Sequence, residues 1–471
     1  MNKSKFESIR EKLEPVLISD AFIWLSFVIA CIVTTFRIEV AGLVIFTLLI
    51  SFILVFCEDI IATLAPFLLL CVSLIKCHDS YDTFIKMWWI AIPAFPSLVF
   101  HFQYYKHKYI KSDLLKPMIA VSVAVTLGGL FEISAKEYFS LVSVFYTLGL
   151  GFGMLLFYML MNDNILLRKN YSLSEKITKI FIIMGLFCCF MIIEHYLFNL
   201  DKVLETHKNL EFQWRNNVST FLLFSIPFVF LHSYKGNHAW IWAGFLFYGC
   251  VLLTGSRGGM VTGTAEVIVS MIALLYLDKR HRKYNIIIIF AGIGICLFFF
   301  WDIIYFFRGM LMRLLNYDEY KIRVGLFARA IEDFKSNPLF GRGLAYFGNR
   351  DLHHSVKFAL CWYHSSPFQI IGSFGLLGVA AYLYQFVERI RFYLKRQTVT
   401  NAFILIIYLS LEMMSLVNPG LFSPPYLMIM MILFVVMDRM NDDENANRIE
   451  KIKAKRKKEK LEKKEFKKSK V

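Results

Sequence analysis

The chain has 471 residues, of which 57% are hydrophobic and only 19% are charged, and its formal net charge is +16. A soluble domain carries closer to a quarter charged residues, so this composition excludes an ordinary soluble globule and indicates a polytopic membrane protein. The nine cysteines form no C-x-x-C pair, so we expect neither a disulfide framework nor a zinc site from them.

Residues 1–20 (MNKSKFESIREKLEPVLISD) are polar along their whole length and lack a cleavage site of small residues, so we interpret them as a cytoplasmic lead-in. The multi-pass membrane domain, residues 21–437, contains apolar runs that predict about fourteen spanning helices, of which the shortest are the weakest predictions. The predicted fold is therefore an all-α, polytopic membrane helix bundle. The runs cover residues 21–36, 40–56, 60–75, 85–100, 115–131, 140–161, 177–199, 217–232, 238–253, 258–277, 284–307, 366–386, 400–417 and 422–437.

The connections between these runs alternate in charge. HFQYYKHKYIKSDLLK, LLRKNYSLSEK, DKRHRKYN and ERIRFYLKRQ are rich in Lys and Arg, whereas FRIE, KCHDSYD, FEISAKEY and VNPGLF are poor in them. Basic connections stay in the cytoplasm, so both termini are expected there. The lysine-rich tail, residues 438–471, helical or disordered, is then typical of a topology anchor or an anionic-lipid contact rather than a nucleic-acid site.

The stretch LLTGSRGGMVTG, residues 252–263, lies at a predicted outer junction between two helices. Arg257 follows Ser256 and precedes Gly258, where the second helix begins. Free N–H groups at a helix N-terminus attract anions, an arginine fork suits phosphate oxygens, and glycine lets a ligand approach the backbone. The pattern predicts a site for an anion with a lipid tail. The alternative is a tight hairpin whose arginine extends to the lipid headgroups.

The long connection over residues 308–364 is predicted to lie on the outer side. Its segment EYKIRVGLFARAIEDFKSNPLFGRG has apolar residues at helical spacing and ends in Asn-Pro and a Gly-x-Gly turn. We therefore expect a surface helix followed by a turn. Arg323 on this helix is a candidate second phosphate ligand and Arg329 a further contact, although solvated arginines are the more common case.

His364, in YHSSPFQ, lies where this connection re-enters the membrane, and it could take a proton from a hydroxyl near neutral pH. The alternative is an interfacial histidine bonded to backbone. Arg215 and Asn217, in FQWRNNVST, are on the same predicted side and are candidate contacts for a sugar or a diphosphate. Asn216 or Asn217 could instead cap the following helix.

Acidic residues within apolar runs are functional candidates because they are costly there. Glu266 is the deepest, and Glu132, Glu194, Asp302 and Glu412 lie towards outer helix ends. Several of these acids could pair with the outer arginines, or they could form the proton path of a coupled transporter. Asp351, His353 and His354 have irregular spacing and no second carboxylate, so we predict no metal and no cofactor. The chain lacks G-x-x-x-x-G-K-[ST], which excludes an ATP-driven pump of that type.

The ordered series TGSRGG, IRVGLFARAIEDFKSNPLFGRGLAYF and HSSPFQIIGSFGLLG resembles the O-antigen ligase and O-antigen polymerase superfamily of bacterial envelope glycan enzymes. The resemblance covers about residues 200–390. It implies a metal-independent glycosyltransferase of the bacterial cytoplasmic membrane, which moves a glycan from an undecaprenyl (polyprenyl) diphosphate to an acceptor hydroxyl on the outer face. It further implies that Arg257 and Arg323 hold the donor diphosphate and that His364 activates the acceptor.

The remaining substrate-binding candidates are Ser256, Gly258, Arg215, Asn217 and Arg329. The expected partners are the lipid-linked donor, a glycan or lipid-anchored acceptor and membrane lipids, without nucleic acid. Ligation and polymerisation stay open, because Ser365 stands where many relatives have asparagine and the motifs concern the shared donor. The alternatives are a transporter or flippase of lipid-linked oligosaccharide and a scaffold without catalysis.

Overall fold

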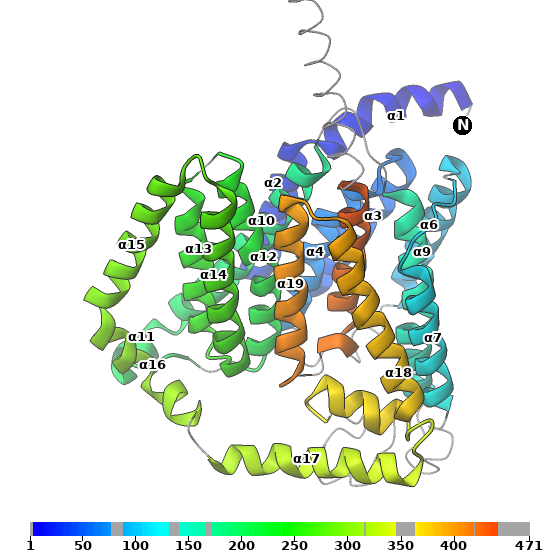
Figure 1. Ribbon diagram of the computed structural model, residues 1–471. Helices are drawn as coiled ribbons and strands as arrows, with labels where there is room; N and C mark the ends of the chain where they lie inside the picture. Colours follow the sequence, from blue (N-terminus) through cyan, green and yellow to red (C-terminus); the bar gives the residue numbers. More distant parts are fainter. Residues whose placement is uncertain are drawn as a thin grey trace, which may run out of the picture.

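The structure, a computed structural model, describes residues 3–76, 88–106, 108–130, 141–165, 172–210, 212–236, 238–314, 317–344, 363–418 and 420–440. Every extended regular element within these ranges is a helix, and none is a strand. The predicted all-α membrane helix bundle is therefore confirmed (Figure 1).

The helices follow one another closely along the chain. The N-terminal half contains α1 (Lys3–Ile18), α2 (Asp20–Thr35), α3 (Glu39–Phe56), α4 (Leu64–Ser73), α6 (Ala91–Tyr105), α7 (Leu115–Leu130), α8 (Leu141–Leu148), α9 (Met154–Asn164) and α10 (Leu173–Phe198). The C-terminal half contains α11 (Leu200–Thr206), α12 (Arg215–Tyr234), α13 (Trp240–Leu253), α14 (Arg257–Leu277), α15 (Arg282–Phe298), α16 (Phe300–Leu314), α17 (Tyr317–Ser336), α18 (Ser366–Lys395), α19 (Val399–Ser415) and a last helix over residues 424–440.

Six helices in the described part of the chain are long and apolar enough to cross a membrane, and the number rises to eight if each of two bent pairs is one span. Four further apolar helices have 10–17 residues. The fourteen segments predicted from apolar runs thus exceed the helices that meet this test of length and composition.

The predicted segment 284–307 is not one straight helix. It divides into α15 and α16, which are bent by 71° at Phe299. Residues 300–314, expected partly as a span and partly as a connection, form α16 at the same end of the bundle as α17 (Figure 1).

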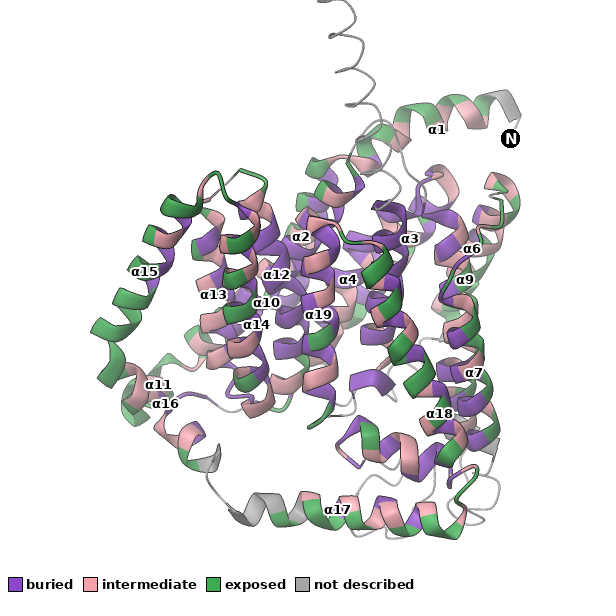
Figure 2. Ribbon diagram, in the orientation of Figure 1, coloured by how far each residue is buried: buried purple, intermediate pink, exposed green. Residues whose placement is uncertain are grey.

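The centre of the bundle is formed by α10 and α12, which are buried along most of their length, whereas α15 and much of α17 are exposed (Figure 2). Phe181 of α10 stacks on Phe228 of α12 with ring centroids 4.7 Å apart. Gly185 lets α13 approach α10, because a Cβ there would be 2.3 Å from the Phe247 ring. This tightly packed centre holds the ends of α12, α13 and α14 in fixed relation.

The helices α1 and α17 lie at opposite ends of the bundle (Figure 1). Basic residues from several connections pair with acids at the α1 end. Lys176 lies 3.5 Å from Asp20, and Arg396 bonds both Asp438 at 2.5 Å and Asp113 at 3.3 Å. The described residues of these basic connections therefore share one end of the molecule, and α17 lies at the other (Figure 1).

Candidate functional site

The turn between α13 and α14 is fixed by three polar contacts. Ser256 is the N-cap of α14 and its Oγ accepts a hydrogen bond from the Gly259 N–H at 3.1 Å. The same hydroxyl donates to Asn216 Oδ1 of α12 at 2.7 Å. Gly255 has a φ of +67°, and a Cβ there would be 2.8 Å from Asn209 Nδ2. Arg257, partly buried, is thereby held as the first residue of α14, beside that helix's free N–H groups.

The start of α14 and the helix α17 meet at the C-terminal end of α19. A Cβ on Gly258 would lie 3.0 Å from the Val417 side chain, which is a tight contact, so the glycine favours this close approach of α14. From α17, Arg323 Nη1 donates to the Val417 carbonyl oxygen at 2.9 Å. Gly258 follows Arg257 directly, so the α14 turn that carries Arg257 and the guanidinium of Arg323 both lie beside one residue, Val417.

Arg329 has different partners from Arg323. Its guanidinium lies 3.3 Å from Glu332 and 3.5 Å from Asp333, both on α17 itself. This geometry favours a role within α17 over the contact with substrate that the sequence suggested.

The residue before His364 anchors it to two helices. Tyr363 is fully buried, and its hydroxyl donates to Asp333 of α17 at 2.5 Å. The Tyr363 N–H donates to Gln369 Oε1 of α18 at 3.0 Å. Burial raises the pKa of Asp333 above its usual value, while the Tyr363 hydrogen bond acts in the opposite direction. His364 itself is partly buried and has a left-handed φ of +53°, a conformation that costs free energy in a non-glycine residue and is common at functional sites.

The helix that follows His364 is broken and joined to the turn after α17. Gly375 inside α18 has φ +59° and ψ −153°. A Cβ there would be 2.6 Å from the Pro338 carbonyl oxygen, and a Cβ on Gly341 would be 2.4 Å from the Ser373 carbonyl carbon. Four backbone hydrogen bonds of 2.9–3.1 Å connect the segments: Arg342 N to Gly372 O, Gly343 N to Ser373 O, Leu376 N to Pro338 O and Leu377 N to Leu339 O.

Near the start of α12, Asn216 rather than Asn217 reaches the α14 turn. Trp214 is the N-cap and makes no capping side-chain bond, so the alternative that either asparagine caps the helix is wrong. Asn217 instead accepts from the Tyr426 hydroxyl at 3.3 Å. Arg215 is partly buried at the first position of α12. The sequence alone could not predict the contact of Asn216 with Ser256, because it joins residues far apart in the chain.

Two of the acids considered as partners of the outer arginines, Glu194 and Glu412, pair with other residues instead. Glu194 lies 2.7 Å from Lys76, and Glu412 lies 3.9 Å from Arg389. Glu266 is 2% exposed, and neither carboxylate oxygen accepts a hydrogen bond from the described residues. Glu132, Asp351, His353 and His354 lie outside the described residues.

A groove of about 250 Å³ lies between the two halves of α18 and α19. It begins at Pro367, three residues after His364, and its wall is mostly apolar with the Arg389–Glu412 pair in it. Another cavity, of about 640 Å³, is lined by α1, α2 and α10 at the far end of the bundle. Only the first adjoins His364, so we associate the smaller groove with the site.

A family model described as O-antigen ligase matches residues 242–383. The matched segment includes Arg257, Arg323 and His364, whereas Arg215 and Asn217 lie before it. A search of curated proteins finds no match. The resemblance inferred from the sequence is confirmed over residues 242–383, the part of this membrane protein that is similar to the O-antigen ligase family.

Proposed function

We propose that the protein transfers a glycan from a polyprenyl-diphosphate donor to an acceptor hydroxyl on the outer face of the bacterial cytoplasmic membrane, with both termini in the cytoplasm. The observation that carries this proposal is the convergence of Gly258, next to Arg257, and of Arg323 on Val417. Two guanidinium groups beside a helix N-terminus form an environment suited to a diphosphate.

The leaving group of this transfer is a diphosphate, on which negative charge increases as its bond to the anomeric carbon breaks. Arg257, Arg323 and the free N–H groups of α14 would stabilise that charge. Ser256 would keep the N-terminus of α14 in position through its bonds to Gly259 and Asn216.

His364 would act as the general base. As the acceptor oxygen forms its bond to the anomeric carbon, the proton of the acceptor hydroxyl would pass to the imidazole. Tyr363 and Ser365 restrain the histidine on both sides, since Tyr363 binds α17 and Ser365 is the N-cap of α18. This route uses two arginines, a helix terminus and a histidine, and no step in it requires a metal or a nucleotide.

The groove between the halves of α18 and α19 fits the start of a polyprenyl chain. It has mostly apolar walls and adjoins the residue assigned as base. The chain would then leave the site sideways into the bilayer, while the glycan stays at the α17 end.

The test is complementation of a strain lacking this protein with wild type, Arg257→Ala, His364→Ala or the control Arg391→Ala, at matched expression. Arg391 is an exposed arginine of α18 paired with Glu388. We expect donor to accumulate and the surface glycan to be lost in the first two variants only. Wild-type behaviour of both would overturn the assignment.

The products would also distinguish the finer functions. Glycans of a single repeat indicate that the missing activity is polymerisation. Full-length glycan retained on its lipid carrier indicates that it is ligation. Lipid-linked oligosaccharide that stays on the cytoplasmic side, out of reach of an outer-face probe, would instead favour the flippase and contradict the transferase.

A further inference from the structure

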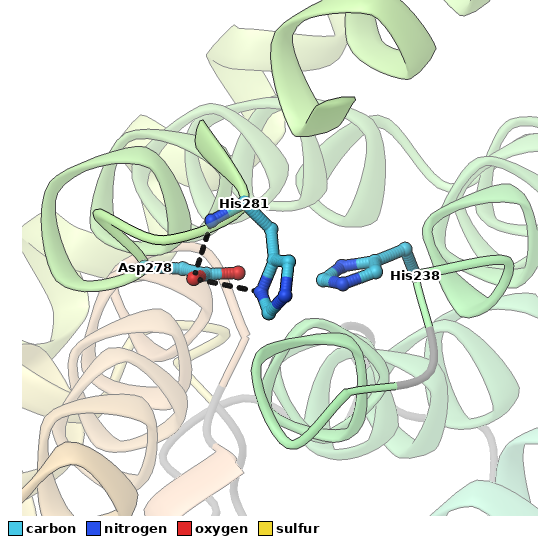
Figure 3. Close-up of side chains that lie close together, drawn as sticks. All are labelled: His238, Asp278 and His281. Atoms are coloured by element: carbon cyan, nitrogen blue, oxygen red, sulfur yellow. Dashed lines mark hydrogen bonds and ion pairs between the residues drawn. The ribbon is translucent and has the colours of Figure 1, made fainter. Parts of the chain in front are cut away.

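Three potential metal ligands meet at the end of the bundle opposite to Arg257. His238 lies in the connection between α12 and α13, Asp278 is the C-cap of α14, and His281 precedes α15 (Figure 3). One ligand atom from each residue lies within 4.8 Å of the others. The two imidazole rings are tilted towards each other, with centroids 4.3 Å apart.

Asp278 is already oriented as a ligand would be. Its Oδ1 lies 3.2 Å from His281 Nδ1 and accepts the His281 backbone N–H at 3.1 Å. Its Oδ2 accepts from Asn285 Nδ2 at 3.0 Å. Carboxylates and histidines that bind metals are commonly positioned by such outer hydrogen bonds.

His238 provides the independent observation. Its Nδ1 is buried and has no hydrogen-bond partner among the described residues. A buried polar atom without a partner is uncommon and calls for an explanation such as an ion. Figure 3 shows the His238 ring next to that of His281, which lies between His238 and Asp278.

We propose that His238, Asp278 and His281 bind a transition-metal ion, with Zn²⁺ as the best fit. Two imidazoles and one carboxylate are ligands for Zn²⁺, whereas Mg²⁺ and Ca²⁺ require mainly oxygen. A hard cation held only by charge is further disfavoured, because four basic residues flank His281 and would repel it: Lys279, Arg280, Arg282 and Lys283. Ligand atoms in a tetrahedral zinc site are roughly 3.3 Å apart, so small side-chain rotations would complete the set.

The metal would have a structural role. α13 and α14 form a hairpin whose closed end is the turn before Arg257 and whose open end lies at His238 and Asp278. An ion bound there would hold the start of α13 to the end of α14, and it would attach the start of α15 to both. α14 has 21 residues and is thus roughly 30 Å long, which places the ion far from the proposed transfer chemistry. This inference is independent of the proposed function.

The experiment uses full-length protein in detergent, purified through a tag without histidine and stripped with EDTA. Zinc content after desalting and the shift of the melting temperature with added Zn²⁺ are measured. The variants are His238→Ala, His281→Ala and the milder Asp278→Asn. The control is His232→Ala, a partly buried histidine at the end of α12 that is not part of the cluster.

We expect about one bound zinc per chain and a higher melting temperature in wild type and the control. Affinity should fall at least tenfold in His238→Ala and His281→Ala, and Mg²⁺ should give no shift. The proposal is overturned if wild type binds no zinc, if His238→Ala and Asp278→Asn both bind it as wild type does, or if Mg²⁺ gives the same shift.

Discussion

Arg257 gains its position from the residues around it. Ser256 caps the helix, Gly255 makes the left-handed turn, and Gly258 allows contact with Val417. The sequence predicted the helix start and the need for glycine, since both follow from local backbone preferences. It could not predict Val417 or Asn216 as neighbours, because those contacts depend on how distant helices pack.

At the residue scale, Arg257→Ala should lower the transfer rate on the order of 100-fold, as expected when one group that stabilises developing charge is removed. Arg257→Lys should lose less, because the charge stays while the planar fork is lost. Transfer from lipid-linked donor in isolated membranes would be measured, with Arg391→Ala as reference. Equal rates for Arg257→Ala and Arg391→Ala would contradict the role.

The variant His364→Asn distinguishes the proposed role of the imidazole as a base from the role of this residue in the backbone turn. Asparagine tolerates the left-handed φ of +53° yet cannot accept the proton, so we expect the rate to fall by about 100- to 10,000-fold. KM should change little, because the loss concerns the transition state. A raised KM with unchanged kcat would instead indicate a binding role.

At the scale of elements, α17 and α18 form one unit through Asp333–Tyr363, the stacked rings of Phe327 and Phe368, and the backbone bonds at the break in α18. The apolar spacing predicted α17, and Leu326 and Ala330 are buried as that spacing implies. The break at Gly375 was not predicted. A glycine within an apolar run carries no local sign that its backbone meets another segment.

Gly375→Ala tests this unit. Its left-handed φ and the Pro338 oxygen 2.6 Å from the added Cβ should together cost about 1–3 kcal/mol or more of stability. We expect a lower melting temperature and weaker transfer. Gly325→Ala, on α17 with open space around its Cβ, is the control and should be neutral or slightly stabilising. Equal melting temperatures would show that the break is not needed.

Asp333 should make stability depend on pH. Its pKa is raised in the folded protein by burial, so between the unfolded and folded pKa values the folded state binds more protons. The free energy of unfolding should therefore fall as pH rises through that interval, with the full contribution present below the unfolded pKa. The measurement is a series of melting curves between about pH 4 and 7, which covers roughly this interval and the range above it. The melting temperature of Asp333→Asn should depend less on pH than that of the wild type. An unchanged pH dependence in that variant would contradict the assignment.

At the scale of the whole molecule, charge divides the bundle into two ends. Alternating basic connections predicted this division, and the ion pairs of Asp20, Asp113 and Asp438 lie together at the α1 end. The cluster of His238, Asp278 and His281 lies there too and was missed. Its ligands come from two successive connections, and only the packing of α12 to α15 brings them together.

The orientation can be measured directly. A fluorescent protein fused after Met440 should fluoresce, and alkaline phosphatase at the same position should be inactive. The alternation of basic connections predicts that this end of the chain lies in the cytoplasm. Alkaline phosphatase inserted after Thr206, in the connection that follows α11, should be active. The opposite pattern would reverse the assignment of the outer face and place Arg257 in the cytoplasm.

The joint between α18 and the turn after α17 also bears on how such chains diverge. Gly341 and Gly375 each lack a side chain where the other segment's backbone passes, so either substitution alone should be harmful. We expect the two positions to be inherited as a pair: lineages that keep the joint keep both glycines, and lineages that lose one are released from selection on the other. An alignment of relatives would reveal this as covariation between two positions that are distant in sequence.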